Sequence, residues 1–513
     1  MQLSCRLLTI ALLIAFMPCR EVRAQDYNPD IDVVQYRFLL GVSDTSDRIT
    51  GEATLSVLFK KDTKTFRLDL DKGMVVSSID AKGQPLTFTQ DASAVTITGV
   101  FRKGQTMDLK IVYSGIPADG LIIASNKYGH RGFFGDNWPN RAHNWLPCID
   151  DPSGKAPVEF LIQAPAHYTV VANGALVEEK PLNNDTRLTH WKETAPLAPK
   201  IMVVGIADFA VDHPGDAMGV PVWNYVYKED RTIGFQSYSH ALQILPFYIS
   251  HIGPYPFLKC GNVQSRTRFG GLENAGAIFY FEGSVSSPGV ESLMAHEIAH
   301  QWFGDAATET EWKHLWLSEG FATYMTHCYL ESRYGADTLR AGMKKDRAQV
   351  IGFEAKRLTA IVDTTVHEDY MQLLNPNNYQ KGSWVLHMLR RKLGDQLFWK
   401  TISAYYTTYR GRNASSEDFN RIADSVSGQN LHPFFHQWLD RPGHPRLKIT
   451  QQNNSLQIDQ VQPELYQCTL EYAIQGKTYK AEIKDRHTSI KLPRPSAPIT
   501  FDPNANLLYD EAP

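Results

Sequence analysis

The sequence has few cysteines, no marked excess of charge of either sign and, after its first two dozen residues, no long hydrophobic run. Its six cysteines form no CxxC pair, so neither a disulfide framework nor a cysteine-based metal site is indicated. The 52 basic and 55 acidic residues give a net charge of −3, which argues against a nucleic-acid partner. With 43% hydrophobic residues the composition is that of a globular protein, and 513 residues predict about three domains.

Residues 1–24 predict a cleavable secretory signal peptide. Arg6 precedes Leu7–Met17, which is apolar except for Thr9. This stretch is too short to cross a bilayer of about 30 Å but suits the core of a signal peptide. Small or modest residues at Val22 and Ala24 favour cleavage before Gln25. We therefore expect a periplasmic or secreted protein with no membrane span after signal removal.

The rest of the sequence predicts a multi-domain α+β fold. Residues 25–207 alternate apolar and polar side chains, which is typical of a large N-terminal antiparallel β domain. Residues 208–443 have mainly helical spacing, and residues 444–513 return to short alternating strands, enough for a small β-sandwich. The predicted strands of the first domain are 53–59, 65–70, 94–100, 107–115, 158–165 and 168–177. The predicted helices are 233–252, 291–303, 317–334, 383–393, 398–409, 416–427 and 432–439.

A metal site is the strongest chemical signal. His296, Glu297 and His300 form an HExxH motif on a predicted helix, where the two histidines share one face. Glu297 points to a neighbouring angle and can act as a general base. Glu319, with 18 residues between it and His300, supplies a third ligand on the next predicted helix. Two imidazoles and one carboxylate favour one zinc ion per chain with an open coordination position.

The segments HEIAHQWFGD and WKHLWLSEGFATY resemble the M1 family of zinc aminopeptidases, in the gluzincin clan. The resemblance implies a thermolysin-like catalytic domain at 208–443 and covers nearly all of the chain. Longer members continue into a helical domain that covers the cleft, whereas this sequence resembles a short secreted bacterial type without that domain.

Two further motifs extend the resemblance. Gly270-Gly271-Leu272-Glu273-Asn274 is similar to the exopeptidase motif of the family, which implies that Glu273 binds the substrate's free α-ammonium group, with Gly270, Gly271 and Asn274 at the substrate. Tyr379-Gln380-Lys381-Gly382 is similar to the YxKG element, which implies that Tyr379 stabilises the oxyanion.

The sequence also departs from the family pattern. Trp145–Pro152 resembles a structural segment of the β domain, but no Gln or Glu stands shortly before it, where many relatives have a second contact to the substrate amine. Asp136 is the nearest candidate for that contact. Asp305 replaces a more usual Asn and is expected either to orient a ligand histidine or to form a surface cap.

These residues predict a zinc-dependent aminopeptidase that acts on peptides with a free N-terminus. In this interpretation Glu297 moves the proton and Tyr379 supports the oxyanion. Two alternatives stay open: a zinc endopeptidase, which would have no use for Glu273, and a secreted peptide-binding scaffold with weak or no activity.

Overall fold

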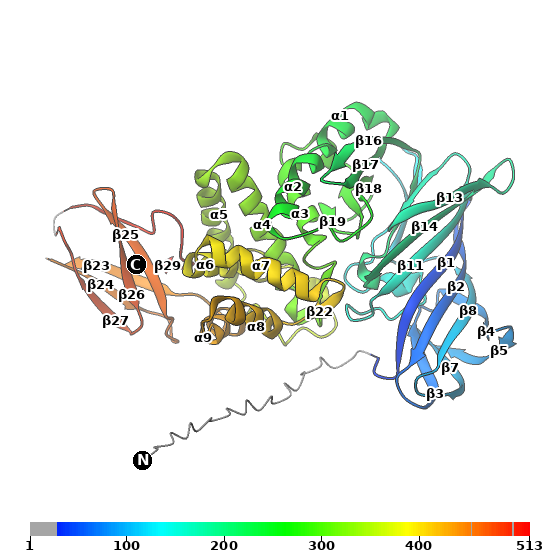
Figure 1. The fold of residues 1–513 in the computed structure, drawn as a ribbon, viewed down its shortest axis with the longest axis horizontal. Coiled ribbons are helices and arrows are strands. Elements are labelled where there is room, and N and C mark those ends of the chain that lie inside the picture. Colours follow the sequence, from blue (N-terminus) through cyan, green and yellow to red (C-terminus); the bar gives the residue numbers. More distant parts are fainter. Residues whose placement is uncertain (1–27, 453, 495–496, 513) are drawn as a thin grey trace, which may run out of the picture.

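The computed structural model describes residues 28–452, 454–494 and 497–512, so the predicted signal peptide lies outside the described residues. Figure 1 shows β-sheets at the N-terminal end, helices in the middle and further β-sheets at the C-terminal end. This arrangement confirms the predicted α+β class. The predicted boundaries at residues 207 and 443 stay predictions.

The N-terminal part is built on an eight-stranded sheet with the order β13-β14-β11-β1-β2-β8-β4-β5. Its neighbours pair antiparallel, as predicted for this domain, with the one exception of β1 and β11, which are parallel. A long connection separates β1 from β11, and side-chain alternation carries no information on the direction of such a distant partner. The strands are β1 (Ile31–Ser43), β2 (Ser46–Phe59), β4 (Met74–Ala81), β5 (Gln84–Pro85), β8 (Thr106–Gly115), β11 (Ala156–Pro165), β13 (Ala175–Pro181) and β14 (Thr186–Leu197).

Two smaller sheets complete this part. One has the order β12-β15-β10-β9 and the other β3-β7-β6. The strand predicted at 168–177 is divided between β12 and β13, because the chain turns at Gly174, which has a φ of +81°. The strands are β3 (Thr63–Asp69), β6 (Thr87–Gln90), β7 (Ala94–Phe101), β9 (Leu121–Ser125), β10 (Arg131–Gly135), β12 (Thr169–Ala172) and β15 (Val204–Ala207).

The middle of the chain combines a five-stranded sheet, β16-β17-β18-β20-β19, with nine α-helices among the described residues. The strands are β16 (Phe209–Ala217), β17 (Val220–Tyr227), β18 (Cys260–Ser265), β19 (Gly271–Leu272) and β20 (Ala277–Phe281), and a short pair adds β21 (Ala307–Glu309) and β22 (Arg412–Ala414). The helices are α1 (Arg231–Tyr238), α2 (Ala241–His251), α3 (Val290–His300), α4 (Trp316–Tyr334), α5 (Ala336–Glu354), α6 (Gly382–Leu393), α7 (Asp395–Tyr409), α8 (Ser416–Ser427) and α9 (His432–Phe435).

Two helices differ from the sequence-based expectation. The helix predicted at 233–252 is two helices, α1 and α2, separated at Ser239 and His240. Helix α5 was not predicted. Its buried side chains form only a narrow stripe, and Gly342 and Gly352 inside it weaken the helical signal. The capping box at the start of α8 is present, with Ser415 and Asp418 each bonded to the other's backbone.

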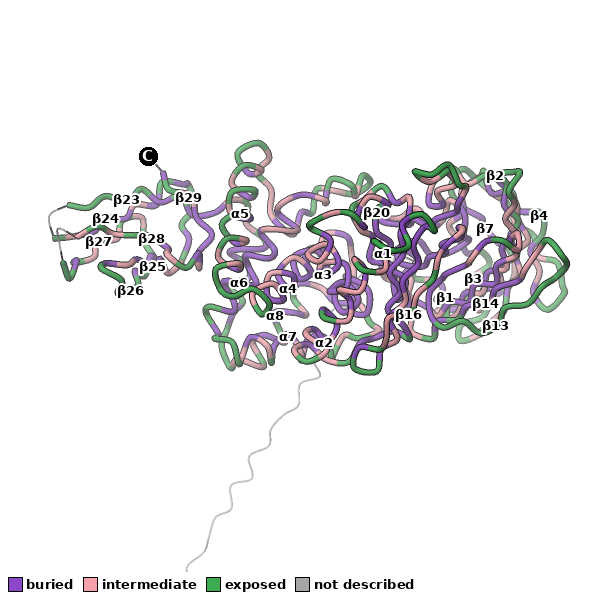
Figure 2. Tube along the Cα trace, turned by 90° about the horizontal axis from the view of Figure 1, so that it is seen from above, coloured by how far each residue is buried: buried purple, intermediate pink, exposed green. Residues whose placement is uncertain are grey.

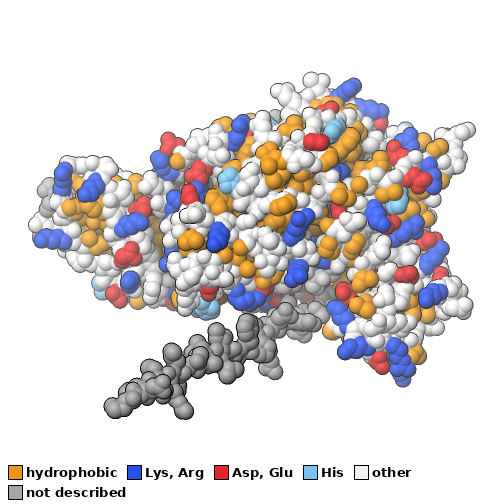
Figure 3. All heavy atoms as spheres, viewed as in Figure 1, with side chains coloured by type: hydrophobic (Ala, Val, Ile, Leu, Met, Phe, Trp, Pro, Cys, Tyr) orange, Lys and Arg blue, Asp and Glu red, His pale blue; other side chains and the backbone are white. Residues whose placement is uncertain are grey.

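The C-terminal part contains two sheets, β27-β24-β23-β29 and β26-β25-β28. Figure 2 shows buried chain running through the helices and between the sheets, with exposed segments at the outer edges. On the face in Figure 3, acidic and basic side chains are mixed, in line with the small net charge. The strands are β23 (Arg446–Gln452), β24 (Ser455–Gln460), β25 (Cys468–Ile474), β26 (Lys477–Ile483), β27 (His487–Lys491), β28 (Ile499–Phe501) and β29 (Asp510–Glu511).

Two findings concern the described residues as a whole. Cys148, Cys260, Cys328 and Cys468 are free thiols, and the first three are buried. Within the described ranges, no helix combines the length and the hydropathy that a membrane crossing requires.

Candidate active site

The structure brings the three predicted metal ligands together. His296 and His300 lie one turn apart on α3, and Glu319 lies in the first turn of α4. The two Nε2 atoms are 3.2 Å apart, and Oε2 of Glu319 lies 3.4 Å from Nε2 of His296 and 3.2 Å from Nε2 of His300. Atoms bound at 2.0–2.1 Å to one tetrahedral zinc ion would be about 3.3 Å apart, so these side chains fit the ion as they stand.

The surroundings of His300 fix its role as a ligand. Its Nδ1 atom lies 3.1 Å from the carbonyl oxygen of Phe303 and 3.0 Å from Oγ of Ser318. Because a carbonyl oxygen only accepts, Nδ1 carries the hydrogen, and Nε2 presents its lone pair to the site. A side chain on Gly304, which has a φ of +108°, would overlap Ser318. The glycine in HEIAHQWFGD is therefore needed for this hydrogen bond.

The site favours a positive charge at the ligands. Burial disfavours a charged imidazole, yet the adjacent Glu319 carboxylate raises the pKa of His300 to about 10. Two imidazole nitrogens that face each other at 3.2 Å repel unless a proton or a cation lies between them. Among the described residues, this is the one group of three His, Cys, Asp or Glu residues whose ligand atoms lie within 4.8 Å of one another. These observations support a single zinc site.

Tyr379 reaches the metal ligands because two segments approach closely. It lies on the π-helical turn Asn377–Lys381 directly before α6. A side chain on Gly320 of α4 would come within 2.8 Å of Cα of Gly382, so two glycines allow α4 and α6 to meet next to Glu319. The Tyr379 ring lies nearly parallel to that of His296, with ring centres 6.1 Å apart. Burial and the Glu319 carboxylate raise the pKa of Tyr379, so its hydroxyl stays protonated and can donate.

Glu273 follows β19 and is buried, with a relative exposure of 5%. Within the described part of the chain, its Oε1 atom has no hydrogen-bond partner. Burial raises the pKa of this carboxyl, and Glu319 adds to the effect. An unpartnered buried carboxylate oxygen is unfavourable by itself and is satisfied by a ligand that brings a positive charge and N–H donors.

The predicted general base Glu297 lies on α3 between the two histidines in sequence. Its carboxylate lies directly against Gly271, where any side chain would overlap it. Burial raises the pKa of Glu297 well above its ordinary value, and the nearby Glu273 and Glu319 carboxylates add to this rise. Such a group is suited to holding a proton and passing it on.

These residues line one cavity of about 290 Å³. Apolar side chains form the rest of its wall, several of them in one hydrophobic cluster around Trp138, Leu272 and Trp312. The lining residues are Trp138, Phe269, Gly270, Gly271, Leu272, Glu273, Leu293, His296, Glu297, His300, Glu319, Leu374 and Tyr379.

Two predicted substrate contacts are not among these lining residues. Asp136 is fully buried and pairs with Arg141, and it also accepts from Oγ1 of Thr267 at 3.3 Å and from the backbone N of Arg268 at 3.4 Å. Because these neighbours occupy its oxygens, the structure does not offer Asp136 to a substrate amine. Asn274 is also buried outside the lining. The segment after Asp136 contributes Trp138 to the cavity instead.

Sequence reasoning missed Gln301, a buried residue whose side chain holds the backbone of the exopeptidase motif. Its Nε2 donates to the backbone oxygen of Glu273 and to Oδ2 of Asp305, each at 2.8 Å. Its Oε1 accepts from the backbone N of Gly276 at 2.8 Å. The Asp305 side chain is therefore a buried partner of Gln301, neither a surface cap nor a hydrogen-bond partner of the imidazole of a ligand histidine. A polar residue directly after HExxH was the signal available in the sequence.

Comparison with known proteins identifies the family to which this sequence and fold belong. Residues 33–198 match the family model of the peptidase M1 N-terminal domain, and residues 237–438 match that of the peptidase family M1 domain. The chain belongs to peptidase family M1. A crystal structure of the M1 zinc metallopeptidase from Deinococcus radiodurans superposes with a TM-score of 0.71 and 25% identity, over 81% of this chain and 95% of that one.

Two curated relatives of this M1 chain are longer than it is. "Aminopeptidase M1" of Arabidopsis thaliana is 25% identical over 338 residues, which are 63% of this chain and 38% of the relative. "Tricorn protease-interacting factor F2" of Thermoplasma acidophilum is 25% identical over 455 residues, 85% of this chain and 56% of the relative. The matches therefore span between about two fifths and three fifths of the relatives' own length.

The contact between Gly271 and Glu297 yields a test of the site geometry. In Gly271→Ala the new methyl group overlaps the Glu297 carboxylate, so we expect kcat for hydrolysis at this site to fall about 100-fold, as for displacement of one catalytic group. Zinc content, measured by atomic absorption, should stay at the wild-type level. In Gly270→Ala the methyl group meets only Cδ1 of Leu293 at 3.7 Å, and a clearly smaller loss is expected. Equal losses in both variants would contradict this geometry.

Proposed function

We propose that this M1 family chain is a zinc-dependent aminopeptidase that releases single residues from the free N-terminus of peptides. The observation that carries the proposal is the unpartnered Oε1 of Glu273 in the same cavity as the metal ligands. A substrate ammonium group satisfies that oxygen with a charge-assisted hydrogen bond. Because Glu273 and the metal ligands line the same cavity, the bound ammonium sets which peptide bond reaches the metal site.

The other residues of the cavity then have defined roles. Zinc held by His296, His300 and Glu319 supplies Lewis-acid activation at the scissile carbonyl when bound. Glu297 accepts the proton of the attacking water and returns it to the leaving amine. Tyr379 donates its hydroxyl hydrogen to the carbonyl oxygen as negative charge develops there. The two relatives support this proposal through family membership, and one of them carries the name aminopeptidase.

Hydrolysis of two matched peptides tests the proposal. The peptides are identical except that one has an acetylated N-terminus, which removes the charge and the donors that Glu273 would bind. We expect residues to be released one after another from the free peptide only. Mass spectrometry of the reaction over time detects the shortened peptides. Glu273→Gln should raise KM and lower kcat/KM by at least about 100-fold for the free peptide, since a buried charged contact is lost. Cleavage of both peptides would indicate an endopeptidase, and cleavage of neither by the zinc-loaded protein would indicate a binding scaffold.

The cavity wall also suggests which N-terminal residues are preferred. Trp138, Phe269, Leu272 and Leu374 offer apolar surface, while the carboxylates of the lining are those of Glu273, Glu297 and Glu319, which already have roles. We expect kcat/KM to be about 10-fold or more higher for aminoacyl substrates with Leu, Met or Phe than with Ala, from apolar burial worth about 1.5–3 kcal/mol. Lys and Asp should be poor. A fluorogenic aminoacyl panel measures this order, and a preference for Lys or Arg would overturn it.

We further propose that the chain is exported with the help of residues 1–24, and that it acts in the periplasm or outside the cell. The support is the sequence pattern of a short apolar stretch after Arg6 and the small residue at Ala24. Expression of the full sequence in a bacterial host, followed by fractionation and N-terminal sequencing, is expected to give Gln25 as the first residue of an exported protein. A cytosolic product that begins at Met1 would contradict the proposal.

A further inference from the structure

The turn that carries Tyr379 has an unusual backbone. Residues Asn377–Lys381 form a π-helical turn, in which the backbone N of Lys381 donates to the oxygen of Pro376 at 2.8 Å. Such turns are rare and are frequently found at functional sites. The position of the Tyr379 hydroxyl therefore depends on what anchors this turn.

Lys381 is an anchor that the proposed function does not use. It is fully buried, and its Nζ donates to Oε1 of Glu354 at 2.7 Å and to the backbone oxygen of Gly443 at 2.8 Å. The other carboxylate oxygen of Glu354 binds Nδ1 of His444. Exposure of the Lys381 and Glu354 side chains is 0% and 1%. Three elements thus meet in one buried polar network: the π-helical turn, the end of α5 and the linker to β23.

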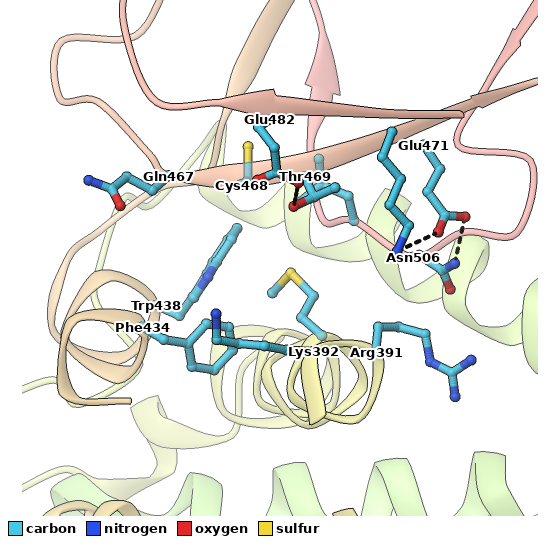
Figure 4. Close-up of a pocket in the computed structure, with 13 residues that line it drawn as sticks. Arg391, Lys392, Phe434, Trp438, Gln467, Cys468, Thr469, Glu471, Glu482 and Asn506 are labelled. Carbon is cyan, nitrogen blue, oxygen red and sulfur yellow. Dashed lines mark hydrogen bonds and ion pairs between the residues drawn. The ribbon is translucent and has the colours of Figure 1, made fainter. Parts of the chain in front are cut away.

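This network connects the turn to the C-terminal sheets. Gly443 and His444 stand just before β23, and Gly443 has a φ of +88°, a conformation that favours glycine. The other anchors of the turn lie within the helical part, where Nδ2 of Asn377 donates to the oxygen of Thr359 at 2.8 Å and Gly382 meets Gly320. The helical part and the C-terminal sheets also border a cavity of about 380 Å³, which lies between α6 and strands β25 and β26 (Figure 4). Its walls carry Arg391 and Lys392 on one side and Glu471 and Glu482 on the other.

We propose that Lys381, Glu354 and His444 are positioning residues for Tyr379, and that through them the linker to the C-terminal sheets sets the geometry of the oxyanion site. The proposal rests on the proposed function, because it assigns these residues to the step in which Tyr379 acts. Removing one member of a buried charged network leaves an uncompensated charge. The turn can relieve that charge only by moving Lys381, and Tyr379 lies two residues away on the same turn.

A double-mutant cycle between Glu354 and Tyr379 tests the coupling. Glu354→Gln keeps the shape of the side chain but removes the negative charge opposite Lys381. The amide nitrogen then faces His444, so that His444 meets a hydrogen-bond donor in place of the carboxylate acceptor. We expect a fall in kcat of about 10-fold, a fraction of the roughly 100-fold loss for Tyr379→Phe, which removes the oxyanion donor itself. KM and zinc content should stay near the wild-type values. In the Tyr379→Phe background, Glu354→Gln should change kcat by less than about 2-fold, because the group it positions is already missing.

Asp346 provides a matched control on the same helix. It is buried on α5 and pairs with Nε2 of His327 at 2.8 Å, so Asp346→Asn removes a buried, hydrogen-bonded carboxylate of the same helix away from the turn. Its effect on kcat should be the same in the wild-type and Tyr379→Phe backgrounds. If Glu354→Gln lowers kcat by the same factor in the wild-type and Tyr379→Phe backgrounds, the positioning role is overturned.

A second pair of variants covers the case in which Glu354→Gln does not fold. His444→Asn retains an N–H donor near the position of Nδ1, whereas His444→Leu removes it. We expect kcat near the wild-type value for His444→Asn and a loss similar to that of Glu354→Gln for His444→Leu. Equal activity of the two would overturn the proposal. A wild-type protein that releases no residue from the free peptide, or a Tyr379→Phe variant with full activity, would count against the proposed function instead.

Discussion

The dominant physical constraint on this molecule is the concentration of buried acidic groups around two imidazoles. Glu273, Glu297 and Glu319 line one cavity, and Asp305 lies buried behind them. Burial raises the pKa of Asp305 well above its ordinary value, and Glu273 adds to the rise. In a low-dielectric site such groups repel one another strongly. A cation at His296, His300 and Glu319 relieves this repulsion, and so does an ammonium group beside Glu273, which links the metal and the substrate through one electrostatic requirement.

Side chains around the cavity supply further positive charge and hydrogen bonds that offset the repulsion between the carboxylates. Lys200, from the short helical turn Pro199–Ile201 at the end of the β-rich part, pairs with Glu309 of β21, and both side chains are within 1% of complete burial. Its charge also lowers the pKa of Glu273 and of Asp305 against the effect of burial. Gln301 ties the backbone of Glu273 to Asp305. Segments that connect the N-terminal strands therefore contribute to the site in two ways, with the counter-charge of Lys200 and with the aromatic wall of Trp138.

Close backbone approach decides the geometry within this charged site. Gly271 leaves room for the Glu297 carboxylate, Gly304 for the hydrogen bond between Ser318 and His300, and Gly320 with Gly382 for the contact that brings Tyr379 to Glu319. At each of these positions a side chain would overlap either a functional group or the backbone of the neighbouring segment. The further link from Lys381 through Glu354 to His444 extends the same logic to the linker of the C-terminal sheets.

The sequence by itself identified the three clustered ligand residues and the succession of β, α and β regions, largely because helix and strand spacing are local. The role of Glu297 as general base stays a prediction. Two histidines four residues apart must share a helical face, and alternating side chains must form strands wherever they pack. Only the tertiary structure decided the parallel pairing of β1 with β11, the withdrawal of Asp136 into an ion pair with Arg141, and the meeting of Lys381 with Glu354 and His444. The strand pairing and the Lys381 network join residues that are far apart in sequence. For Asp136, the ion pair with Arg141 competes with the alternative of binding a substrate amine. Local pattern carries no information about which distant partner wins, since that choice depends on burial and on the charges that the completed fold places nearby.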